Sequence, residues 1–283
     1  MSIEIKDLQF YYQKGTPYEK EALRRIDLTI DDGEFVAIIG HTGSGKSTLG
    51  QHLNGILRPY SGSVKVNGLD VADKKTKLLS VVRQVGLSFQ YPEHQLFAAS
   101  IWEEVEIGPR NLGYSEAKIK SLTEENLHRM GLLAARDQSP FALSGGEQRR
   151  LALAAVLAMD TPILVLDEPT VGLDPRGRRE IGDFILQLQR EEKKTVVWIG
   201  HDLGEIARLA QRLVVMDKGR VAMDGSVREI FGRYRELSAS GICLPDPVRV
   251  VAALREAGKP VAFPLLDEEE VYAAISHWLE GSV

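Results

Sequence analysis

Apolar and polar positions alternate at the start of the chain, and short continuous apolar runs follow. From Ile3 to Tyr12 apolar side chains recur close to every second position, which predicts a strand with one buried face. Residues 35–39, 163–166 and 195–199 are apolar nearly throughout, which is typical of strands buried on both faces of a largely parallel sheet. A smaller strand is predicted over 62–68, between two turns.

Helical periodicity occupies the stretches between these strands. The first predicted helix follows Ile39 and places Leu49, Leu53 and the pair 56–57 on one face. Four further helices are predicted at residues 102–107, 117–130, 146–159 and 176–190. Strands that alternate with helices, with a helical insertion between two of the strands, predict an α/β architecture with a helical subdomain.

The pattern changes after about residue 235, where four prolines interrupt the chain. Two short amphipathic helices are predicted there, over 248–256 and 268–279. The second has Asp267 as a candidate N-cap, with Glu270 three residues later. The segment is either a tail that packs on the core or a small accessory or dimerisation module, and the pattern favours neither.

Composition and charge restrict the class of protein. The 283 residues are 43% hydrophobic and 27% charged, which is globular, and at about 150 residues per domain they form one large domain or two. Lys and Arg number 35 against 40 Asp and Glu, so the net charge of −5 lacks the positive field that draws proteins to nucleic acid. The single cysteine, Cys243, excludes an intramolecular disulfide framework and fits a reducing compartment.

The chain also lacks a sequence signal for insertion into a membrane. No apolar stretch approaches the roughly 20 residues that span a bilayer. The first residues carry charges, unlike those of a signal peptide. We therefore expect a soluble, cytoplasmic protein that acts at a membrane only by docking on the helices of other proteins.

The strongest chemical signal follows the apolar run 35–39. Residues 40–47 read Gly-His-Thr-Gly-Ser-Gly-Lys-Ser, a full match to G-x-x-x-x-G-K-[ST] between a predicted strand and a predicted helix. The glycines let successive N–H groups turn toward phosphate oxygens, and the helix N-terminus adds up to about 2 kcal/mol for an anion. Lys46 supplies a mobile charge for the β- and γ-phosphates, and the Ser47 hydroxyl can bind Mg²⁺. The pattern predicts a cradle for nucleotide phosphates.

A second chemical signal is a pair of carboxylates, Asp167 and Glu168, directly after the apolar run 163–166. Asp167 can hold Mg²⁺, directly or through water, and Glu168 can orient the attacking water or take its proton. Like charges raise each other's pKa, so the pair is poorly placed for stability alone. An apolar strand that ends in an acidic turn is common by itself, but Lys46 favours the catalytic interpretation.

Three further features narrow the class. Residues 143–148, Leu-Ser-Gly-Gly-Glu-Gln, place two glycines and a hydroxyl at a predicted helix start, which makes a second anion-binding N-terminus. Gln90 follows the strand pattern of 85–89, where its amide can reach Mg²⁺ and the water. His201 follows the last buried run. Each of the three has an ordinary structural explanation when it is taken alone.

Together these residues resemble the ATP-binding-cassette (ABC) ATPases, over about residues 3–233. The resemblance implies an α/β fold: a P-loop NTPase (RecA-like) ABC nucleotide-binding domain with an antiparallel β subdomain, a helical signature subdomain over about 95–160 and a small C-terminal extension. It divides the chain into an ATP-binding domain, residues 1–235, and an accessory or dimerisation segment, residues 236–283.

The resemblance also assigns roles to residues of this chain, with ATP and Mg²⁺ as cofactors. The implied catalytic residues are Glu168, His201, Gln90 and Lys46, and the implied Mg²⁺ ligands are Ser47, Gln90 and Asp167. The implied nucleotide-binding residues are Tyr12, Gly40, His41, Thr42, Gly43, Ser44, Gly45, Lys46, Ser47, Thr48, Ser144, Gly145, Gly146, Glu147 and Asp174. Tyr12 matches the aromatic residue that stacks on adenine, although Leu8, Phe10 and Tyr12 share a strand face and have simple packing as an alternative. Val171 and Gly200 depart from the family's usual residues without removing a chemical group.

In such proteins the signature loop, residues 143–148 here, closes on the ATP held by the other protomer of a head-to-tail dimer. The resemblance therefore implies that a lone chain is an incomplete ATPase, because water exclusion and stabilisation of the γ-phosphate need the second subunit.

A finer resemblance concerns residues 89–97, 102–105 and 108–113, which are similar to the Q-helix region of energy-coupling-factor (ECF) transporter ATPases. These enzymes drive uptake of vitamins and of cobalt or nickel. Residues 15–19 and 40–55 are similar to the second of the two paralogous ATPases, and the prolines of the C-terminal segment fit that subtype.

The finer resemblance implies several partners and a location. The partners are a membrane coupling (T) subunit, a substrate-binding membrane (S) subunit, and a paralogous ATPase or a second copy of this chain. No nucleic acid and no metal other than Mg²⁺ are expected, and the implied location is peripheral, on the cytoplasmic face of the cell membrane. Leu96 and Phe97 either hold a coupling helix as exposed apolar groups or anchor the helical subdomain.

Three other classes of protein share part of this pattern. An ATPase of another ABC importer class shares all the motifs. A DNA-management ATPase shares the cassette but usually carries a long coiled coil, and residues 47–144 sustain no heptads. A P-loop kinase would not need residues 143–147. The sequence does not name the transported solute, because a separate membrane component recognises it in systems of this kind.

Overall fold

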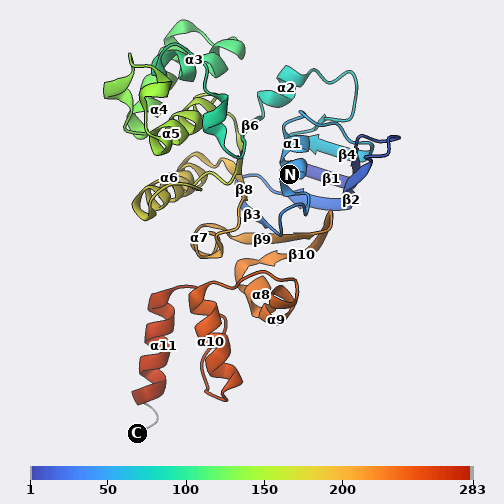
Figure 1. Cartoon of the computed structure of the whole chain (residues 1–283), viewed down its shortest axis with the longest axis vertical. Coiled ribbons are helices and arrows are strands. Elements are labelled where there is room, and N and C mark those ends of the chain that lie inside the picture. The colour runs from blue at the N-terminus through green and yellow to red at the C-terminus, as the bar shows by residue number, and fades with distance from the viewer. Residues whose placement is uncertain (1, 281–283) are drawn as a thin grey trace.

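A mostly parallel sheet of six strands forms the centre of the computed structural model, which describes residues 2–280 (Figure 1). Its strand order is β10 (Arg220–Ser226), β9 (Arg212–Asp217), β3 (Phe35–Ile39), β8 (Thr195–Ile199), β7 (Ile163–Asp167) and β6 (Val85–Ser88). All neighbours pair in parallel except β10 with β9. Every residue of β3, β7 and β8 is buried, as the continuous apolar runs predict.

An antiparallel sheet of four strands packs near the first. Its order is β2 (Lys20–Ile30), β1 (Ile3–Tyr12), β4 (Ser61–Val66) and β5 (Leu69–Asp70). Helix α1 (Lys46–Leu53) shares one apolar core with strands of both sheets, and Leu49 and Leu53 are fully buried in it. The strands predicted over 3–12 and 62–68 are confirmed as β1 and β4.

The end of α1 corrects one prediction. The helix stops at Leu53, so Ile56 and Leu57 do not continue its apolar face, and Ile56 is 47% exposed. Gly55 adopts a left-handed φ of +81°, which ends the helix, and the side chain of Asn54 donates to the carbonyl of Val85 at 2.8 Å.

Helices cover the other face of the central sheet and form the helical subdomain at one end of the molecule (Figure 1). They are α3 (Ile101–Asn111), α4 (Glu116–Arg129), α5 (Gly145–Leu157), α6 (Pro175–Glu192) and α7 (Leu203–Leu209), while the short α2 (Leu78–Val82) precedes β6. Short 3-10 turns lie at Pro92–Gln95, Leu133–Ala135 and Pro140–Ala142. The four helices predicted between residues 102 and 190 are confirmed, with ends shifted by a few residues.

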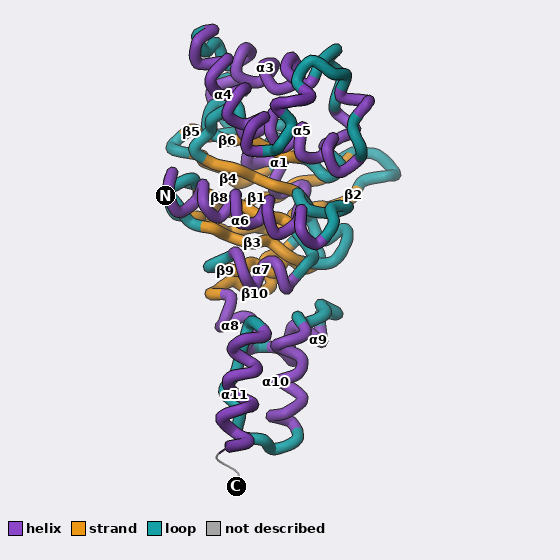
Figure 2. Tube along the Cα trace, turned by 90° about the vertical axis from the view of Figure 1, so that its left-hand side faces the viewer, coloured by secondary structure: helices purple, strands orange, loops and turns teal. Residues whose placement is uncertain are grey.

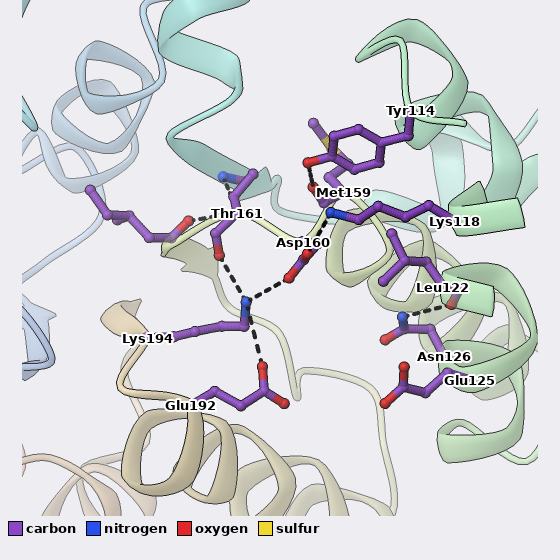
Figure 3. A network of polar contacts seen from close by, with 12 residues as sticks. Tyr114, Lys118, Leu122, Glu125, Asn126, Met159, Asp160, Thr161, Glu192 and Lys194 are labelled. Atoms are coloured by element: carbon purple, nitrogen blue, oxygen red, sulfur yellow. Dashed lines mark hydrogen bonds and ion pairs between the residues drawn. The ribbon is translucent and has the colours of Figure 1, made fainter. Parts of the chain in front are cut away.

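A polar network joins the helical subdomain to the starts of β7 and β8 (Figure 3). Asp160, between α5 and β7, binds Lys118 of α4 at 3.1 Å and Lys194 at 3.2 Å. Burial opposes ionisation of Asp160, but the two lysines outweigh it and lower the pKa of Asp160. Lys194 also reaches the carbonyl of Thr161 at 3.1 Å, so one lysine connects the ends of two core strands.

The C-terminal part consists of α8 (Val227–Gly232), α9 (Tyr234–Ala239), α10 (Asp246–Glu256) and α11 (Glu268–Glu280). Helices α10 and α11 lie side by side at the end of the molecule opposite the helical subdomain (Figure 2). Val251, Val261 and Leu265 form a small core of their own, whereas Leu237 joins the main core. Asp267 accepts the N–H of Glu270 at 2.7 Å, which confirms the predicted cap. Within residues 2–280 no helix is long and apolar enough to cross a membrane.

Candidate functional site

The turn between β3 and α1 carries the predicted phosphate cradle. Gly40, Gly43 and Gly45 have φ values of +148°, +80° and +104°. A Cβ on Gly40 would lie 2.2 Å from the carbonyl oxygen of Met216, and one on Gly45 would lie 2.8 Å from that of Ala22, so only glycine fits at either position. No side chain caps the start of α1, so its first N–H groups remain available to an anion.

Two polar side chains complete the turn. Lys46 Nζ donates to the carbonyl oxygens of Gly40 at 2.7 Å and His41 at 3.0 Å, so the ammonium group lies over the loop. Burial lowers the pKa of Lys46, while the charges of Asp167 and Glu168 oppose that shift. The Ser44 hydroxyl is buried and has no hydrogen-bond partner within residues 2–280. An unpaired buried group costs about 1–3 kcal/mol, so an oxygen-rich ligand such as phosphate fits this cradle.

The donors expected for Mg²⁺ meet beside this turn. Ser47, in the first turn of α1, hydrogen-bonds to Asp167 at the end of β7. Burial raises the pKa of Asp167, the Ser47 hydroxyl and Lys46 lower it, and the neighbouring Glu168 raises it further. Hydroxyl and carboxylate oxygens are the hard ligands that Mg²⁺ prefers, so the residues fit the ion. No cluster of three or more His, Cys, Asp or Glu suited to a metal is found within residues 2–280.

Glu168, Gln90 and His201 come together from the ends of three neighbouring strands. Gln90 Nε2 donates to Glu168 Oε2 at 3.2 Å, and His201 Nδ1 lies 3.2 Å from Glu168 Oε1. A carboxylate only accepts, so Nδ1 carries the proton in this contact. Glu168 has a left-handed φ of +52°, a strained conformation for a residue with a side chain, and its N–H donates to the Ile199 carbonyl at 2.8 Å. The arrangement holds one carboxylate between an amide and an imidazole.

The Leu-Ser-Gly-Gly-Glu motif starts α5 and caps itself. Ser144 accepts the N–H of Glu147 at 3.4 Å, while the Ser144 N–H and hydroxyl donate to Glu147 Oε2 at 2.9 and 2.6 Å. These bonds from Ser144 lower the pKa of Glu147. Ser144 and Gly145 are exposed, and no hydrogen bond or ion pair within residues 2–280 joins residues 143–147 to residues 40–48. The two predicted anion-binding helix starts are therefore not joined by a polar contact within residues 2–280.

The remaining predicted residues lie at the rim of the cradle or apart from it. Tyr12 is 38% exposed, and its hydroxyl lies 3.1 Å from that of Thr48 in α1, while Leu8 is buried in the core. Thr42 is exposed. His41 Nε2 contacts the carbonyl oxygen of Ser240 in the C-terminal part. Two other predicted nucleotide-binding residues lie on other helices than α1. Gly146 is in the first turn of α5, and Asp174 is the N-cap of α6.

The segment after Gln90 separates the two alternatives for its apolar pair. Leu96 is only 7% exposed and belongs to the main core, so of the two alternatives it fits the anchor of the helical subdomain and not the exposed contact. Phe97 is 71% exposed. The turn over 92–95 points the two neighbouring side chains in different directions, one into the helical subdomain and one to solvent.

Sequence reasoning missed a link between this segment and α5. The Arg149 guanidinium, 5% exposed, binds both carboxylate oxygens of Glu93, at 2.7 and 3.2 Å. Glu93 lies three residues after Gln90, and Arg149 lies five residues after Ser144. The buried ion pair therefore connects the loop that carries Gln90 to α5. No local pattern in the sequence indicates this pair.

A nucleotide cradle, two carboxylates and a parallel α/β sheet define a P-loop nucleoside triphosphatase. A family model described as ABC transporter matches residues 23–171. The energy-coupling factor transporter ATP-binding protein EcfA2 of Symbiobacterium thermophilum is 49% identical, over 99% of this chain and 98% of that protein. The protein of the same name from Caldanaerobacter subterraneus is 43% identical, over 100% and 99%.

Solved structures agree with these sequence relatives. The cbiO1 protein of Clostridium perfringens, part of the ABC transporter complex cbiONQ, is 33% identical with a TM-score of 0.73 and covers 89% of this chain and 98% of its own. The dimeric ATP-binding cassette MJ0796, bound to ADP and Pi, is 30% identical with a TM-score of 0.73, over 80% and 99%. The chain belongs to the ABC transporter family of ATPases, within its energy-coupling factor transporter ATP-binding proteins, which confirms the predicted resemblance at both levels.

Proposed function

We propose that this chain binds and hydrolyses ATP as a subunit of an ECF-type importer, which takes up a vitamin or a transition-metal micronutrient. The observation that carries the catalytic part is the position of Glu168 between Gln90 and His201, at the sheet edge that also carries the Lys46 loop. The transport part rests on full-length relatives named as energy-coupling factor transporter ATP-binding proteins.

In the proposed reaction the loop N–H groups and Lys46 hold the β- and γ-phosphates. Ser47, Asp167 and Gln90 would hold Mg²⁺, which when bound would neutralise charge on the phosphate oxygens. Glu168 orients a water toward the γ-phosphorus and accepts its proton as the bond to the bridging oxygen of ADP breaks, which releases phosphate. His201 keeps the Glu168 carboxylate in position, and Tyr12 stacks on adenine at the rim.

The signature loop acts on a second polypeptide in this proposal. Ser144 and Gly145 are exposed, and within residues 2–280 the loop makes no hydrogen bond or ion pair with the cradle of its own chain, which supports an ATP shared between two ATPase subunits. The second subunit is a paralogous ATPase or another copy of this chain. Asp174, at the start of α6, belongs to the same shared surface.

The membrane partners in this proposal are a coupling (T) subunit and, through it, a substrate-binding (S) subunit, which place the chain peripherally on the cytoplasmic face of the cell membrane. Phe97 is the apolar side chain that supports such a contact, because it is exposed next to the loop that carries Gln90. We further propose that residues 1–235 form the ATP-binding domain and residues 236–283 an accessory segment.

Affinity purification of the tagged chain from detergent-solubilised membranes tests this function. A hydrophobic membrane protein and a second ATPase subunit are expected to accompany it, with ATP hydrolysis in the eluate. Phe97→Asp is expected to lose the membrane protein while ATP binding is retained. Tyr272→Asp, an equally exposed aromatic in α11 at the other end of the molecule, is the matched control. Recovery of DNA, or of the chain alone, contradicts the proposal.

A further inference from the structure

A buried carboxyl group lies directly behind the loop that carries His201. Glu205 is in the first turn of α7, and its Oε2 accepts the hydroxyl proton of Thr170 at 2.7 Å. Thr170 follows Glu168 by two residues and is buried. The second oxygen of the Glu205 carboxyl is also buried and has no hydrogen-bond partner within residues 2–280.

The surroundings of Glu205 favour its neutral form. Burial raises the pKa of Glu205 from 4.5 to about 7, the Thr170 hydroxyl opposes that shift, and the charge of Asp202 adds to it. Arg208 and Arg178 are the cations that face it, and they lower the pKa. Near neutral pH a large fraction of Glu205 therefore carries a proton, and the proton is lost as the pH rises through about 7.

Glu205 and Thr170 belong to the two segments that carry the proposed catalytic pair. Glu168 and Thr170 follow β7, while His201 and Glu205 follow β8. At the reacting end the two segments meet through the 3.2 Å approach of His201 to Glu168, and the His201 side chain is 65% exposed. An exposed side chain of this kind depends on its loop for position, because little else packs against it.

Arg178 provides another link between the segment that follows Glu168 and the segment that follows His201. Arg178 of α6 donates to the carbonyl of Leu173 at 3.1 Å and to Asp202 at 3.2 Å. Asp202 in turn accepts the N–H of Glu205 at 3.1 Å. Besides the contact of His201 with Glu168, the two segments are thus joined at two further points: an exposed, charged one through Arg178 and a buried one between Thr170 and Glu205.

We propose that Glu205 is a positioning residue for ATP hydrolysis, because its hydrogen bond with Thr170 holds the segment of His201 in register with the segment of Glu168. The inference rests on the proposed roles of Glu168 and His201. The Thr170 hydroxyl bonds more strongly to the ionised carboxylate, but burial of that charge with one unpaired oxygen costs more, so ionisation of Glu205 favours separation of the two buried segments. Displacements of about 1 Å in such a constellation are enough to lower a rate by about 100-fold.

The test compares wild type, Glu205→Gln, Thr170→Val and Thr170→Ser in the assembled transporter, with kcat and KM for Mg-ATP measured from pH 6 to pH 8.5. Gln keeps the shape of the protonated acid and does not titrate. The ratio of kcat for Glu205→Gln to kcat for wild type is therefore expected to rise by about 3- to 10-fold through pH 7. Thr170→Val is expected to lower kcat about 10-fold with KM little changed, and Thr170→Ser, which keeps the hydroxyl, to restore most of the rate.

Thermal unfolding at each pH separates positioning from stability. The raised pKa of Glu205 means that its stabilising contribution is fully present below the ordinary pKa of 4.5 and is lost as the pH rises through about 7. The stability of wild type should therefore fall relative to that of Glu205→Gln as the pH approaches 7 from below, and the difference should level off above it. Rates are compared at temperatures where every variant is folded, and if Thr170→Val does not fold, the pH profile of Glu205→Gln decides.

A constant rate ratio across this pH range overturns the inference, and so does a Thr170→Val protein with the kcat of wild type. Those outcomes leave the proposed function intact as long as Glu168→Gln abolishes hydrolysis. A Glu168→Gln protein that still turns over ATP would instead overturn the proposed function.

Discussion

The two glycine-rich helix starts of this chain are built in opposite ways. At α1 the cap residue is Gly45 in a left-handed conformation, no side chain caps the helix, and the nearby Ser44 hydroxyl is buried without a partner. At α5 a full capping box between Ser144 and Glu147 satisfies the first turn, which is worth about 0.5–2 kcal/mol. The first start lacks polar partners that a ligand would supply, and the second is stable in water without one.

The surroundings of the two helix starts also differ. The start of α1 adjoins the ends of β7 and β8, which carry two carboxylates and a histidine, while the start of α5 faces solvent. The start of α1 thus has the features of a site that needs a ligand, whereas the start of α5 needs none, which agrees with the proposal that it completes a site on another chain. Four predictions test this difference, in order of expected effect.

The largest effect is expected at the complete site. Glu168→Gln should lower kcat by at least about 100-fold, because an amide cannot accept the proton of the water, while ATP affinity changes little. Phosphate release and calorimetric titration measure the two quantities. Glu124→Gln, at an exposed position on α4, is the control for the loss of a carboxylate. Near-normal hydrolysis by Glu168→Gln would refute the proposed role.

Lys46→Ala should act on binding itself. Removing the ammonium group that lies over the loop is expected to weaken ATP binding by about 10- to 100-fold, since hydrogen bonds to charged groups contribute about 1.5–3 kcal/mol. Calorimetry measures the affinity, with Lys120→Ala on the surface of α4 as the matched control. An unchanged affinity would mean that phosphate does not bind in this turn.

Mixing two inactive variants tests whether the starts work on different chains. Ser144→Ala with Lys46→Ala should regain about half of the wild-type rate per mixed dimer, because one of its two sites then has both parts intact. Neither variant alone should show this rate. If the mixture stays inactive, repeating it with one variant in a paralogous ATPase subunit decides between a heteromeric site and no shared site.

The smallest effect is expected from Glu147→Gln. Its carboxylate, held by Ser144, puts a negative charge beside the surface proposed to meet a phosphate. Neutralising it should tighten dimer formation with a non-hydrolysable ATP analogue by about 2- to 5-fold at low salt, and by less at high salt. Sedimentation analysis measures this, with Glu229→Gln, in the capping box of α8, as the control. Weaker or unchanged association would contradict the proposed surface.

Much of the central sheet and of the candidate site could be predicted from the sequence, for physical reasons. Strands buried on both faces must be continuous apolar runs, so β3, β7 and β8 were evident. The resemblance implies Gln90, Glu168 and His201 as catalytic residues, and parallel strands place their carboxyl ends at one edge, which is where the three side chains meet.

Other features depend on geometry that no local pattern encodes. Leu96 and Phe97 are adjacent and both apolar, yet the turn before them buries one and exposes the other. Gly55 ends α1 although apolar residues continue beyond it. Glu93 with Arg149 and Thr170 with Glu205 are pairs separated by 56 and 35 residues, and only the folded chain brings each pair together.

The buried pair of Arg149 and Glu93 has a mechanical consequence. Two parallel hydrogen bonds from a planar, buried guanidinium resist both stretching and rotation. The loop of Gln90 and helix α5, which Ser144 caps, are therefore expected to move together. If Gln90 contacts bound Mg-ATP as proposed, a displacement of its loop would be carried through this pair to the start of α5. In the proposed dimer, the position of this exposed helix start would then depend on whether nucleotide is bound.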